Sequence, residues 1–393
     1  MARNITTGID IGTHQIKVVI AEQRKSRDNK RFPVIIGTGL AQSRGLRHGY
    51  IINSGDTSRG IKTAIKEAER TAGVRVKRAY LSYGGVGLEE IRSRGDIAIT
   101  RADSEVTDFD IEKVLKETEE KIAKRIINRK ILHVVPLRYR IDDEIVLGRP
   151  QGMKGSKLEV DTLFITCLEQ HLNDLIQAVE DVGIEVVDAM ASPIAGSFVT
   201  LTKAQKIAGC VLANIGAETV SIVIFENNIP QSLKVFPIGS TDITHDIALG
   251  LKVSLEEAEQ IKRGAITNAD YSKKKLDDII IARLTDIFNL IDAHLKKIEK
   301  NQLLPAGIIL TGGGSGITTI EDLARASLKL PSKTVSLHIG GNSKKHNVVK
   351  DSSWAVAYGL CIWGFSNEEE SGGIQIAKKT GSNILEWFKQ FLP

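Results

Sequence analysis

The chain has 393 residues, of which 42% are hydrophobic and 26% are charged, and its formal net charge is +5. This composition is typical of a folded protein of about two to three domains and argues against global disorder. The basic residues are scattered over loops such as 24–31 and 272–275 without interleaved aromatic residues, so no nucleic-acid partner is predicted.

The first element is predicted within the N-terminal 21 residues. Two apolar runs, 5–11 and 16–21, are predicted to be strands that are joined by a turn at Gly12. Taken alone, an ordinary β-hairpin explains this stretch, because a glycine turn between apolar runs is a common hairpin signal.

A small α+β unit is predicted next, at residues 86–167. It combines a strand at 95–100, an amphipathic helix over 106–127 and two further strands at 130–142 and 157–167. We expect this unit to be inserted into the first half of the protein.

The N-terminal pattern returns as "NIGAETVSIVI" at residues 214–224. Aligning the two copies pairs Asp10 with Asn214 and Gly12 with Gly216, and both copies read as strand, glycine turn and strand. A unit that is duplicated at so long a period predicts two related halves that face each other across a cleft.

Small residues follow the two turn glycines, Thr13 in the first copy and Ala217 in the second. They allow backbone N–H groups to approach an anion closely, so two such turns on opposite walls predict a polyphosphate held from both sides. A P-loop is excluded because no G-x-x-x-x-G-K-[ST] sequence occurs.

A helical pattern at residues 256–264 carries three charged residues that are spaced three and four positions apart. It places Glu259 and Lys262 on one helix face, with Arg263 beside them. An ordinary surface helix with internal salt bridges also explains this spacing.

A glycine cluster lies within residues 307–317, where a short apolar strand ends in Gly312, Gly313 and Gly314. Helical spacing of Ile320, Leu323 and Leu328 follows. Glycines at a strand-to-helix junction let the backbone lie against a flat or bulky ligand, although a flexible loop is the alternative.

The C-terminal residues 383–393 are predicted to form an amphipathic helix behind a polar linker at 366–382. The helix is too short to span a bilayer and suits the interface of an anionic membrane, with docking on the protein's own core as the alternative. Its apolar face, the predicted membrane contact, consists of Ile384, Leu385, Trp387, Phe388, Phe391 and Leu392.

Three cysteines, Cys167, Cys210 and Cys361, lie singly in apolar runs, which predicts buried thiols in a reducing compartment and no zinc site. The N-terminus lacks the apolar region of a signal peptide, and no run approaches the length of a membrane span. A cytoplasmic protein without a transmembrane helix is therefore expected.

The two turns and the glycine cluster, in this order, resemble the phosphate 1, phosphate 2 and adenosine motifs of the actin, sugar-kinase and heat-shock ATPase superfamily. The resemblance implies an α/β fold of the actin-like, ribonuclease H-like type with two domains, and ATP with magnesium as its cofactors. A metabolite kinase of this superfamily is one alternative function.

Stretches such as "ILHVVPLRYRIDDE" (131–144) and "PIGSTDITHDIALGL" (237–251) resemble the FtsA family, the cell-division branch of the superfamily. This resemblance covers nearly the whole chain. It implies the following division: a first half of 1–85 and 168–203, an insert of 86–167, a second half of 204–365 whose closing helix near 352–365 returns to the first half, a linker of 366–382 and a membrane helix of 383–393.

The family resemblance also implies a function. The protein would form head-to-tail filaments of itself with ATP and attach the FtsZ ring to the cytoplasmic face of the cell membrane at the division site, as a peripheral protein. It would bind the C-terminal tail of FtsZ through the second half, near residues 235–292. A pilus-assembly protein of the PilM type is an alternative with the same build.

The resemblance assigns roles to the site residues. Asp10 would hold magnesium through water, and Gln15 or Lys17 would add a donor to the phosphates. The residues that line the phosphates would be Gly12, Thr13, Gly216 and Ala217. The residues that meet the ribose and base would be Glu259, Lys262, Arg263, Gly312, Gly313 and Gly314.

Two positions depart from the pattern of the hydrolytic branches. Asn214 stands where the second phosphate turn usually carries aspartate, and Ser192 stands where other branches tend to have a glutamate before the proline. A neutral amide cannot act as a base toward water or neutralise a metal. We therefore expect nucleotide binding with at most slow hydrolysis.

Overall fold

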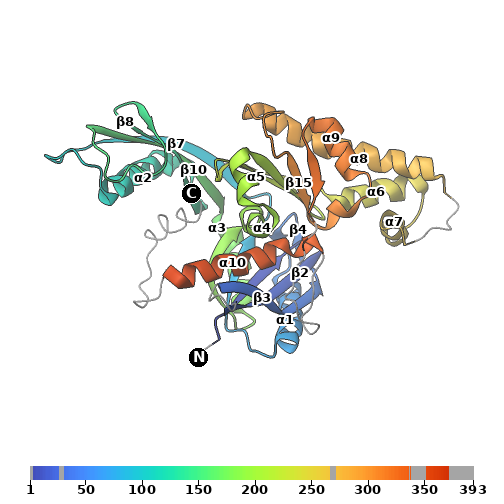
Figure 1. Ribbon diagram of the computed structural model, residues 1–393. Coiled ribbons are helices and arrows are strands. Elements are labelled where there is room, and N and C mark those ends of the chain that lie inside the picture. Colours follow the sequence, from blue (N-terminus) through green and yellow to red (C-terminus); the bar gives the residue numbers. More distant parts are fainter. Residues whose placement is uncertain (1–2, 26–30, 266–270, 336, 338–350, 371–393) are drawn as a thin grey trace.

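The computed structural model describes residues 3–25, 31–265, 271–335, 337 and 351–370. Three larger β-sheets with packed helices make up this part of the chain. Figure 1 shows two sheet-and-helix halves and a smaller unit that projects to one side. The α/β class and the inserted α+β unit are confirmed.

The first half is built on a five-stranded sheet in the order β11-β6-β1-β2-β3. The strands β1, β2 and β3 are antiparallel, whereas β6 and β11 run parallel to β1. The second strand is longer than predicted, because its pairing with β3 continues beyond residue 21 to Lys25. The strands are β1 (Ile5–Ile11), β2 (Gln15–Lys25), β3 (Arg31–Gln42), β6 (Arg78–Tyr83) and β11 (Glu185–Ala191), and a short hairpin is formed by β4 (Leu46–Arg47) and β5 (Tyr50–Ile51).

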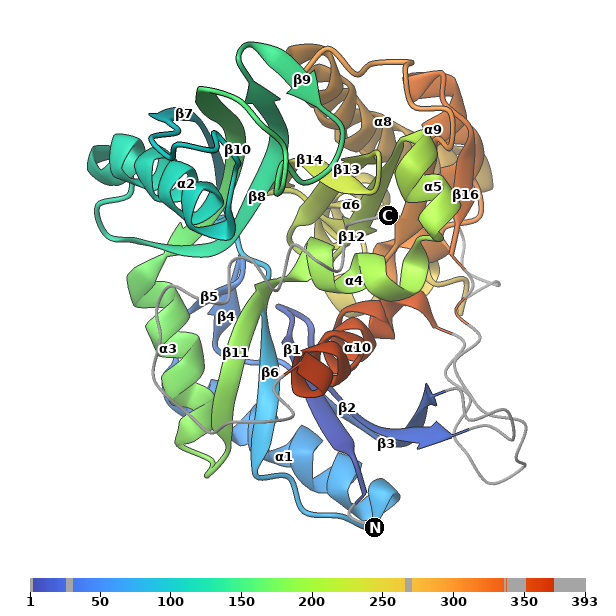
Figure 2. The same cartoon turned by 60° about the vertical axis from the view of Figure 1, so that its left-hand side comes forward.

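Helices cover both faces of this sheet. One side carries α1 and α3, and the other carries α4 and α10, as Figure 2 shows. The helix α1 is fixed at both ends, because the Asn53 side chain accepts the N–H of Asp56 and Gly73 closes the helix at φ 67°. The bounds are α1 (Ser54–Ala72), α3 (Glu169–Glu180), α4 (Ser192–Thr200) and α10 (Ala355–Glu370).

The second half repeats the same sheet topology in the order β14-β13-β12-β15-β16. Again the first three strands in sequence are antiparallel and the last two run parallel to the first. Its elements are α5 (Lys203–Ala208), β12 (Cys210–Ile215), β13 (Val220–Glu226), β14 (Ile229–Phe236), α6 (Ser240–Leu251), α7 (Leu255–Lys262), α8 (Lys273–Lys297), β15 (Ile308–Thr311), α9 (Ile320–Leu328) and β16 (Ser332–Thr334).

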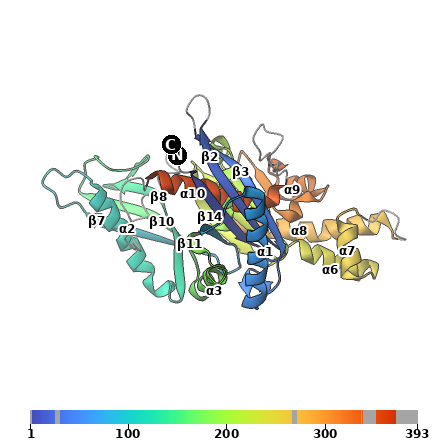
Figure 3. The same ribbon diagram turned by 90° about the horizontal axis from the view of Figure 1, so that it is seen from below.

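The insert is an antiparallel sheet in the order β7-β10-β8-β9 with one long helix on it. Figure 3 shows this unit extending away from the two halves. The helix ends at Ile122, before the predicted residue 127, because a 3-10 turn and a left-handed Asn128 at φ 61° follow. The elements are β7 (Glu89–Ala98), α2 (Asp108–Ile122), β8 (Arg129–Ile141), β9 (Glu144–Val146) and β10 (Lys157–Leu168).

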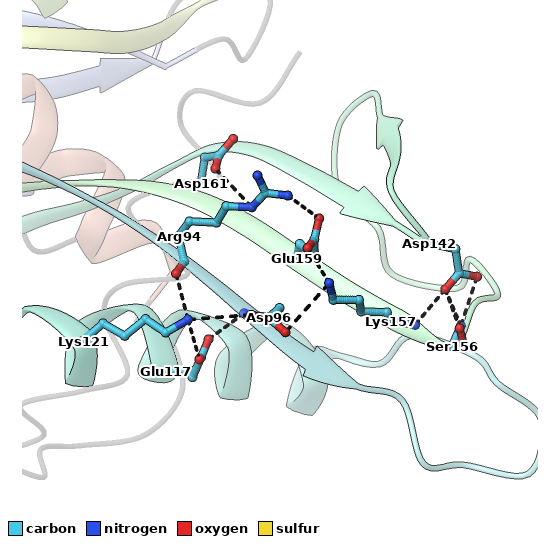
Figure 4. A network of polar contacts seen from close by, with 9 residues as sticks. All are labelled: Arg94, Asp96, Glu117, Lys121, Asp142, Ser156, Lys157, Glu159 and Asp161. Carbon is cyan, nitrogen blue, oxygen red and sulfur yellow. Dashed lines mark hydrogen bonds and ion pairs between the residues drawn. The ribbon is translucent and has the colours of Figure 1, made fainter.

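The two faces of the insert sheet differ in chemistry. The inner face packs apolar residues such as Leu158 and Val160 against α2. The outer face carries cross-strand ion pairs, among them Arg94 with Glu159 at 2.7 Å. Figure 4 shows this network, in which Glu117 and Lys121 of α2 also bind the backbone of β7. Polar side chains therefore satisfy both the open face and the exposed edge of the insert.

One apolar cluster joins the three parts of the molecule. It extends from Ile9 and Leu81 of the first sheet through Val135 of the insert to Phe225 and Leu233 of the second half. All three cysteines are buried and free, as predicted. Within the described ranges, no helix combines the length and the apolar character that crossing a membrane requires. The predicted linker and C-terminal helix, apart from residues 366–370, lie outside the described residues.

Candidate functional site

A cavity of about 750 Å³ lies between the two halves. This volume is in the range of pockets that hold small-molecule ligands, roughly 300 to 1,000 Å³. All nucleotide-site residues predicted from the sequence line this cavity: Asp10, Gly12, Thr13, Gln15, Lys17, Asn214, Gly216, Ala217, Glu259, Lys262, Arg263, Gly312, Gly313 and Gly314. The fold therefore brings the two turns, the α7 helix and the glycine cluster to one place.

The two glycine turns have the same geometry. In the first, the N–H of Gly12 donates to the carbonyl of Gln15 at 3.1 Å. In the second, the N–H of Gly216 donates to the carbonyl of Thr219 at 2.9 Å. A Cβ at either glycine would lie within 2.9 Å of the accepting carbonyl, so the tight turn excludes larger residues. Each turn connects the first two strands of its sheet at the edge of the cavity.

Two opposite charges lie close together at the base of the first turn, where each influences the pKa of the other. Asp10 and Lys17 are directly opposite in the β1–β2 register, and the hydroxyl of Ser82 donates to Asp10 at 2.7 Å. Burial raises the pKa of Asp10 and lowers the pKa of Lys17, and each charge limits the shift of the other. Lys17 is only 9% exposed, so it faces the cavity wall and not the bulk solvent.

The second turn is held by the N-terminus of α6. The N–H of Ser240 donates to the carbonyl of Gly216 at 2.9 Å, and the N–H of Thr241 donates to the carbonyl of Ala217 at 2.8 Å. A Cβ at Gly239 would lie 2.2 Å from the Ala217 carbonyl oxygen, so this approach requires glycine. The positive end of the α6 dipole consequently lies beside the turn, where it favours an anion.

The base of the second turn is uncharged. Asn214 occupies the position of Asp10, and its partner in the strand register is Ser221. The Asn214 side chain lies over Gly312, where a Cβ would be 2.2 Å from its Oδ1 atom. Gly312 has a φ of 89°, which only glycine adopts readily. Gly313 faces open space, so the glycine cluster leaves room next to Asn214.

The predicted charged group of α7 forms one compact network. Lys262 Nζ lies 2.6 Å from Glu259 and also donates to Thr244 at 2.7 Å, and Arg263 Nε lies 2.7 Å from Glu259. Burial would raise the pKa of Glu259, but Lys262, Thr244 and Arg263 together lower it to about 2. The carboxylate is therefore an anionic acceptor that faces the cavity, with two cations beside it.

Sequence reasoning missed several residues that support the site. Ser82 binds Asp10, and Asp351 lies close enough to oppose the shift of the Lys17 pKa. His14 projects from the first turn toward α7, and burial followed by Arg263 lowers its pKa. Signals for two of them exist: Ser82 is the last residue but one of an apolar strand that precedes a glycine pair, and "DSS" at 351–353 is a helix-cap sequence.

Asp10 is the candidate ligand for a magnesium ion in this cavity. Among the described residues there is no group of three or more histidine, cysteine, aspartate or glutamate side chains that would hold a metal ion alone. Magnesium is usually held by one or two carboxylates together with substrate phosphates and water. Asp10 lines a cavity that is large enough for a ligand with several phosphates and so fits that arrangement. It would hold the ion only when phosphates supply further oxygens.

Two family models match the chain. The model of "Cell division protein FtsA" matches residues 211–359. The model of the "SHS2 domain inserted in FTSA" matches residues 85–166. The first match contains the second glycine turn and the glycine cluster, and the second contains the insert.

Curated relatives extend the similarity to the whole chain. The cell division protein FtsA of Pseudomonas aeruginosa is 28% identical over 98% of this chain and 96% of that protein. The FtsA proteins of Borreliella burgdorferi and Bacillus subtilis are 28% and 27% identical, over 99% and 93% of this chain and over 99% and 84% of their own lengths.

Solved structures agree on the architecture. A chain of the PilM-PilN type IV pilus biogenesis complex matches with a TM-score of 0.69 and 18% identity, over 91% of this chain and 98% of its own. MreB5 of Spiroplasma citri bound to ADP matches with a TM-score of 0.53 and 12% identity, over 94% and 99%. At these identities the likeness shows the fold alone, so the pilus-assembly alternative has no further support from it.

Proposed function

Because this chain belongs to the family of the cell division protein FtsA, we propose that it binds ATP with magnesium between its halves and assembles on the membrane at the division site. The observation that carries the nucleotide proposal is the pair of equivalent glycine turns at one cavity. The turns would hold the phosphates, and Asp10 would hold magnesium through water. The α7 network and the glycine cluster would contact the ribose and base.

Charge at the cavity supports this assignment. Lys17, Lys262 and Arg263 supply cations, the N-terminus of α6 adds a positive dipole, and Glu259 offers an acceptor for ribose hydroxyl groups. Calorimetry with Mg-ATP tests the proposal, and we expect a saturable heat of binding with one site per chain. A folded protein that shows no heat with ATP or ADP would contradict it.

We expect the nucleotide to act through conformation more than through turnover. Asn214 is neutral at the position where an acid would orient water, and Ser192 at the start of α4 lines the cavity without a charge. Bound ATP would hold the halves together and favour head-to-tail filaments. Electron microscopy on lipid monolayers, with and without ATP, tests this step, and filaments that form equally well without nucleotide would contradict it.

Membrane attachment is assigned to residues 383–393, which lie outside the described residues. Trp387→Glu should release the protein from anionic liposomes, while Gln390→Glu on the predicted polar face adds the same charge and serves as the matched control. Truncation after Gly381 should act like Trp387→Glu. If the truncated protein sediments with liposomes as well as the intact protein does, the membrane assignment is wrong.

The proposed protein partner is the C-terminal tail of FtsZ, bound through the second half near residues 235–292. Two exposed apolar side chains in this region, Leu249 at 79% and Leu255 at 51%, offer contacts for a peptide. Leu249→Glu should weaken binding of a labelled FtsZ tail peptide by about tenfold, the effect of losing one good apolar contact. Leu147→Glu on the insert, where Leu147 is 96% exposed, is the control.

A further inference from the structure

The short hairpin of β4 and β5 reaches across the cleft between the halves. Its tip consists of His48 and Gly49, which both have positive φ values of 49° and 85°. The tip is fixed to the first half, because Val86 donates its N–H to the carbonyl of His48 at 3.3 Å and a Cβ at Gly49 would lie 2.4 Å from the Cα of Gly85. A conformationally restricted element of the first half is thus placed at the mouth of the cavity.

This tip holds a carboxylate of the second glycine turn. The N–H of His48 donates to Oε2 of Glu218 at 2.6 Å, and Nδ1 of the His48 ring lies 3.3 Å from the Glu218 carbonyl oxygen. Of the four turn residues 216–219, Glu218 is the one that does not line the cavity. The contact joins the two halves directly, since His48 belongs to the first and Glu218 to the second.

A carboxylate on an anion-binding turn requires a physical explanation. Directed into the cavity, it would repel phosphate oxygens and compete with them for the turn N–H groups. Bound to His48, it is directed away from the cavity. A bound polyphosphate therefore favours the outward position of Glu218, and that position forms the bond that connects the halves.

We propose that Glu218 is a nucleotide-dependent latch, which the phosphates of a nucleoside triphosphate hold against His48 so that the two halves stay closed. This inference rests on the proposed function and adds the regulation of the same site. By reciprocity, an intact latch must strengthen nucleotide binding as much as the nucleotide strengthens the latch.

A latch and a simple charge effect predict opposite changes in Mg-ATP affinity when Glu218 is replaced by alanine. If Glu218 only placed a negative charge near the phosphates, Glu218→Ala would tighten Mg-ATP binding. If it is a latch, Glu218→Ala weakens binding by about tenfold, the loss expected for one hydrogen bond to a charged group. Glu218→Gln keeps an acceptor for the His48 N–H and should restore binding to within about threefold of wild type.

The test measures Mg-ATP affinity by calorimetry for wild type, Glu218→Ala and Glu218→Gln. Glu256→Ala is the matched control, since it removes one exposed negative charge from α7 outside the cavity lining. Tighter or unchanged binding by Glu218→Ala would overturn the latch. Wild-type protein without affinity for ATP would overturn the nucleotide site itself.

A distance measurement distinguishes failure of the latch from failure of the nucleotide site. Spin labels at Lys66→Cys on α1 and Lys297→Cys on α8 occupy exposed positions in the two halves, and the native cysteines are buried. We expect Mg-ATP to narrow the distance distribution in the wild-type background, and Glu218→Ala to leave it broad. If nucleotide narrows the distribution equally in Glu218→Ala, the latch is wrong although the nucleotide site stands.

Discussion

The two halves have the same sheet order and the same turns, yet they differ in charge at equivalent positions. The first half places Asp10 opposite Lys17 at the base of its turn, whereas the second places Asn214 opposite Ser221. In each sheet, the fourth strand in sequence order is followed directly by a glycine that lines the cavity, Gly84 after β6 and Gly312 after β15. Backbone geometry is thus shared between the halves, and chemistry is divided between them.

The division has a physical consequence for a bound ligand. The first half supplies a carboxylate at its turn, which suits a hydrated metal ion, and the second half supplies charge from α7, beyond its own turn. Two acidic turns would place like charges on both sides of the phosphates. An acidic residue at the base of one turn and a neutral residue at the base of the other favour holding a metal-bound polyphosphate over activating water against it.

The halves also differ in how the exposed sheet edge is protected. In the first, α1 of the same half covers β3, because Glu67 accepts the N–H of Leu40 at 2.8 Å. In the second, the insert covers β14: Glu90 accepts the N–H of Leu233 and Arg92 donates to the carbonyl of Gln231, each at 2.7 Å. The second half therefore depends on the insert to satisfy its edge strand.

Changing Asp10→Asn gives the first turn the same neutral amide at its base as the second and should have the largest effect. The amide still accepts the Ser82 hydroxyl but cannot neutralise magnesium. Mg-ATP affinity should fall about a hundredfold, which is close to the 3 kcal/mol upper range of hydrogen bonds to charged groups. Calorimetry measures the change, with Asn214→Ala expected to lose less than about threefold. Equal losses would show that the charge asymmetry is irrelevant to binding.

Much of the site followed from the sequence because backbone turns depend on local residues. Gly12 and Gly216 recur in the same strand pattern, so the duplicated hairpins were predictable. The orientation of Lys17 was not, because strand alternation does not reveal which face another element covers. Burial lowers the pKa of Lys17, and Asp10 and Asp351, which is far along the chain, offset part of that shift.

Contacts between distant segments explain why three supporting residues were missed. Ser82, Thr244 and Glu218 act through partners that no local pattern identifies.

The end of α2 was predicted five residues late, at 127, because Ile126 and Ile127 continue the apolar spacing beyond Ile122. The left-handed Asn128 and the bond from the Arg129 N–H to the Ile126 carbonyl form a turn there instead.

Acid should lower the folding stability of the protein through its buried histidines. His133 accepts the N–H of Ala191, which ties the insert to β11, and burial lowers its pKa to about 3. In the unfolded chain this imidazole is protonated below a pKa of about 6.5, so native stability falls as pH drops from 6.5 toward 3. At about 1.36 kcal/mol per pH unit, the loss from His133 reaches about 2 kcal/mol at pH 5.

Urea denaturation at pH 7.5 and pH 5 measures this effect. His133→Gln cannot titrate and its amide oxygen still accepts the Ala191 N–H, so it should lose less stability on acidification than wild type. His294, bound to Ser232 in the second half with a pKa lowered to about 4 by burial, should contribute in the same direction. His245→Gln, at an exposed position, is the control. An unchanged pH dependence in His133→Gln would contradict the assignment.

Two adjacent glycines of the second half should respond differently to the same substitution. Gly312→Ala places a Cβ 2.2 Å from Asn214 Oδ1 and 2.6 Å from the Ile215 carbonyl oxygen at a φ of 89°. It should cost about 2 kcal/mol of stability. Gly313→Ala meets no atom within 4 Å and should change stability by less than about 0.5 kcal/mol. Denaturation midpoints compare the two, and similar losses would refute the strain argument.

The smallest expected effect tests whether the missing carboxylate alone limits hydrolysis. Wild-type turnover should be far below the typical enzyme value of about 10 per second. Asn214→Asp has nearly the same shape as wild type, keeps its place over Gly312 and adds a group that can orient water. Phosphate release with saturating Mg-ATP should rise about tenfold, which corresponds to a decrease of about 1.4 kcal/mol in the activation barrier.

Calorimetry provides the control, because a change in rate must be distinguished from a change in affinity. A variant that binds ATP as tightly as wild type but turns over no faster would show that the second half lacks more than one charge. Ser192, which lines the cavity at the start of α4 and is uncharged, would then be the next candidate for the missing catalytic charge.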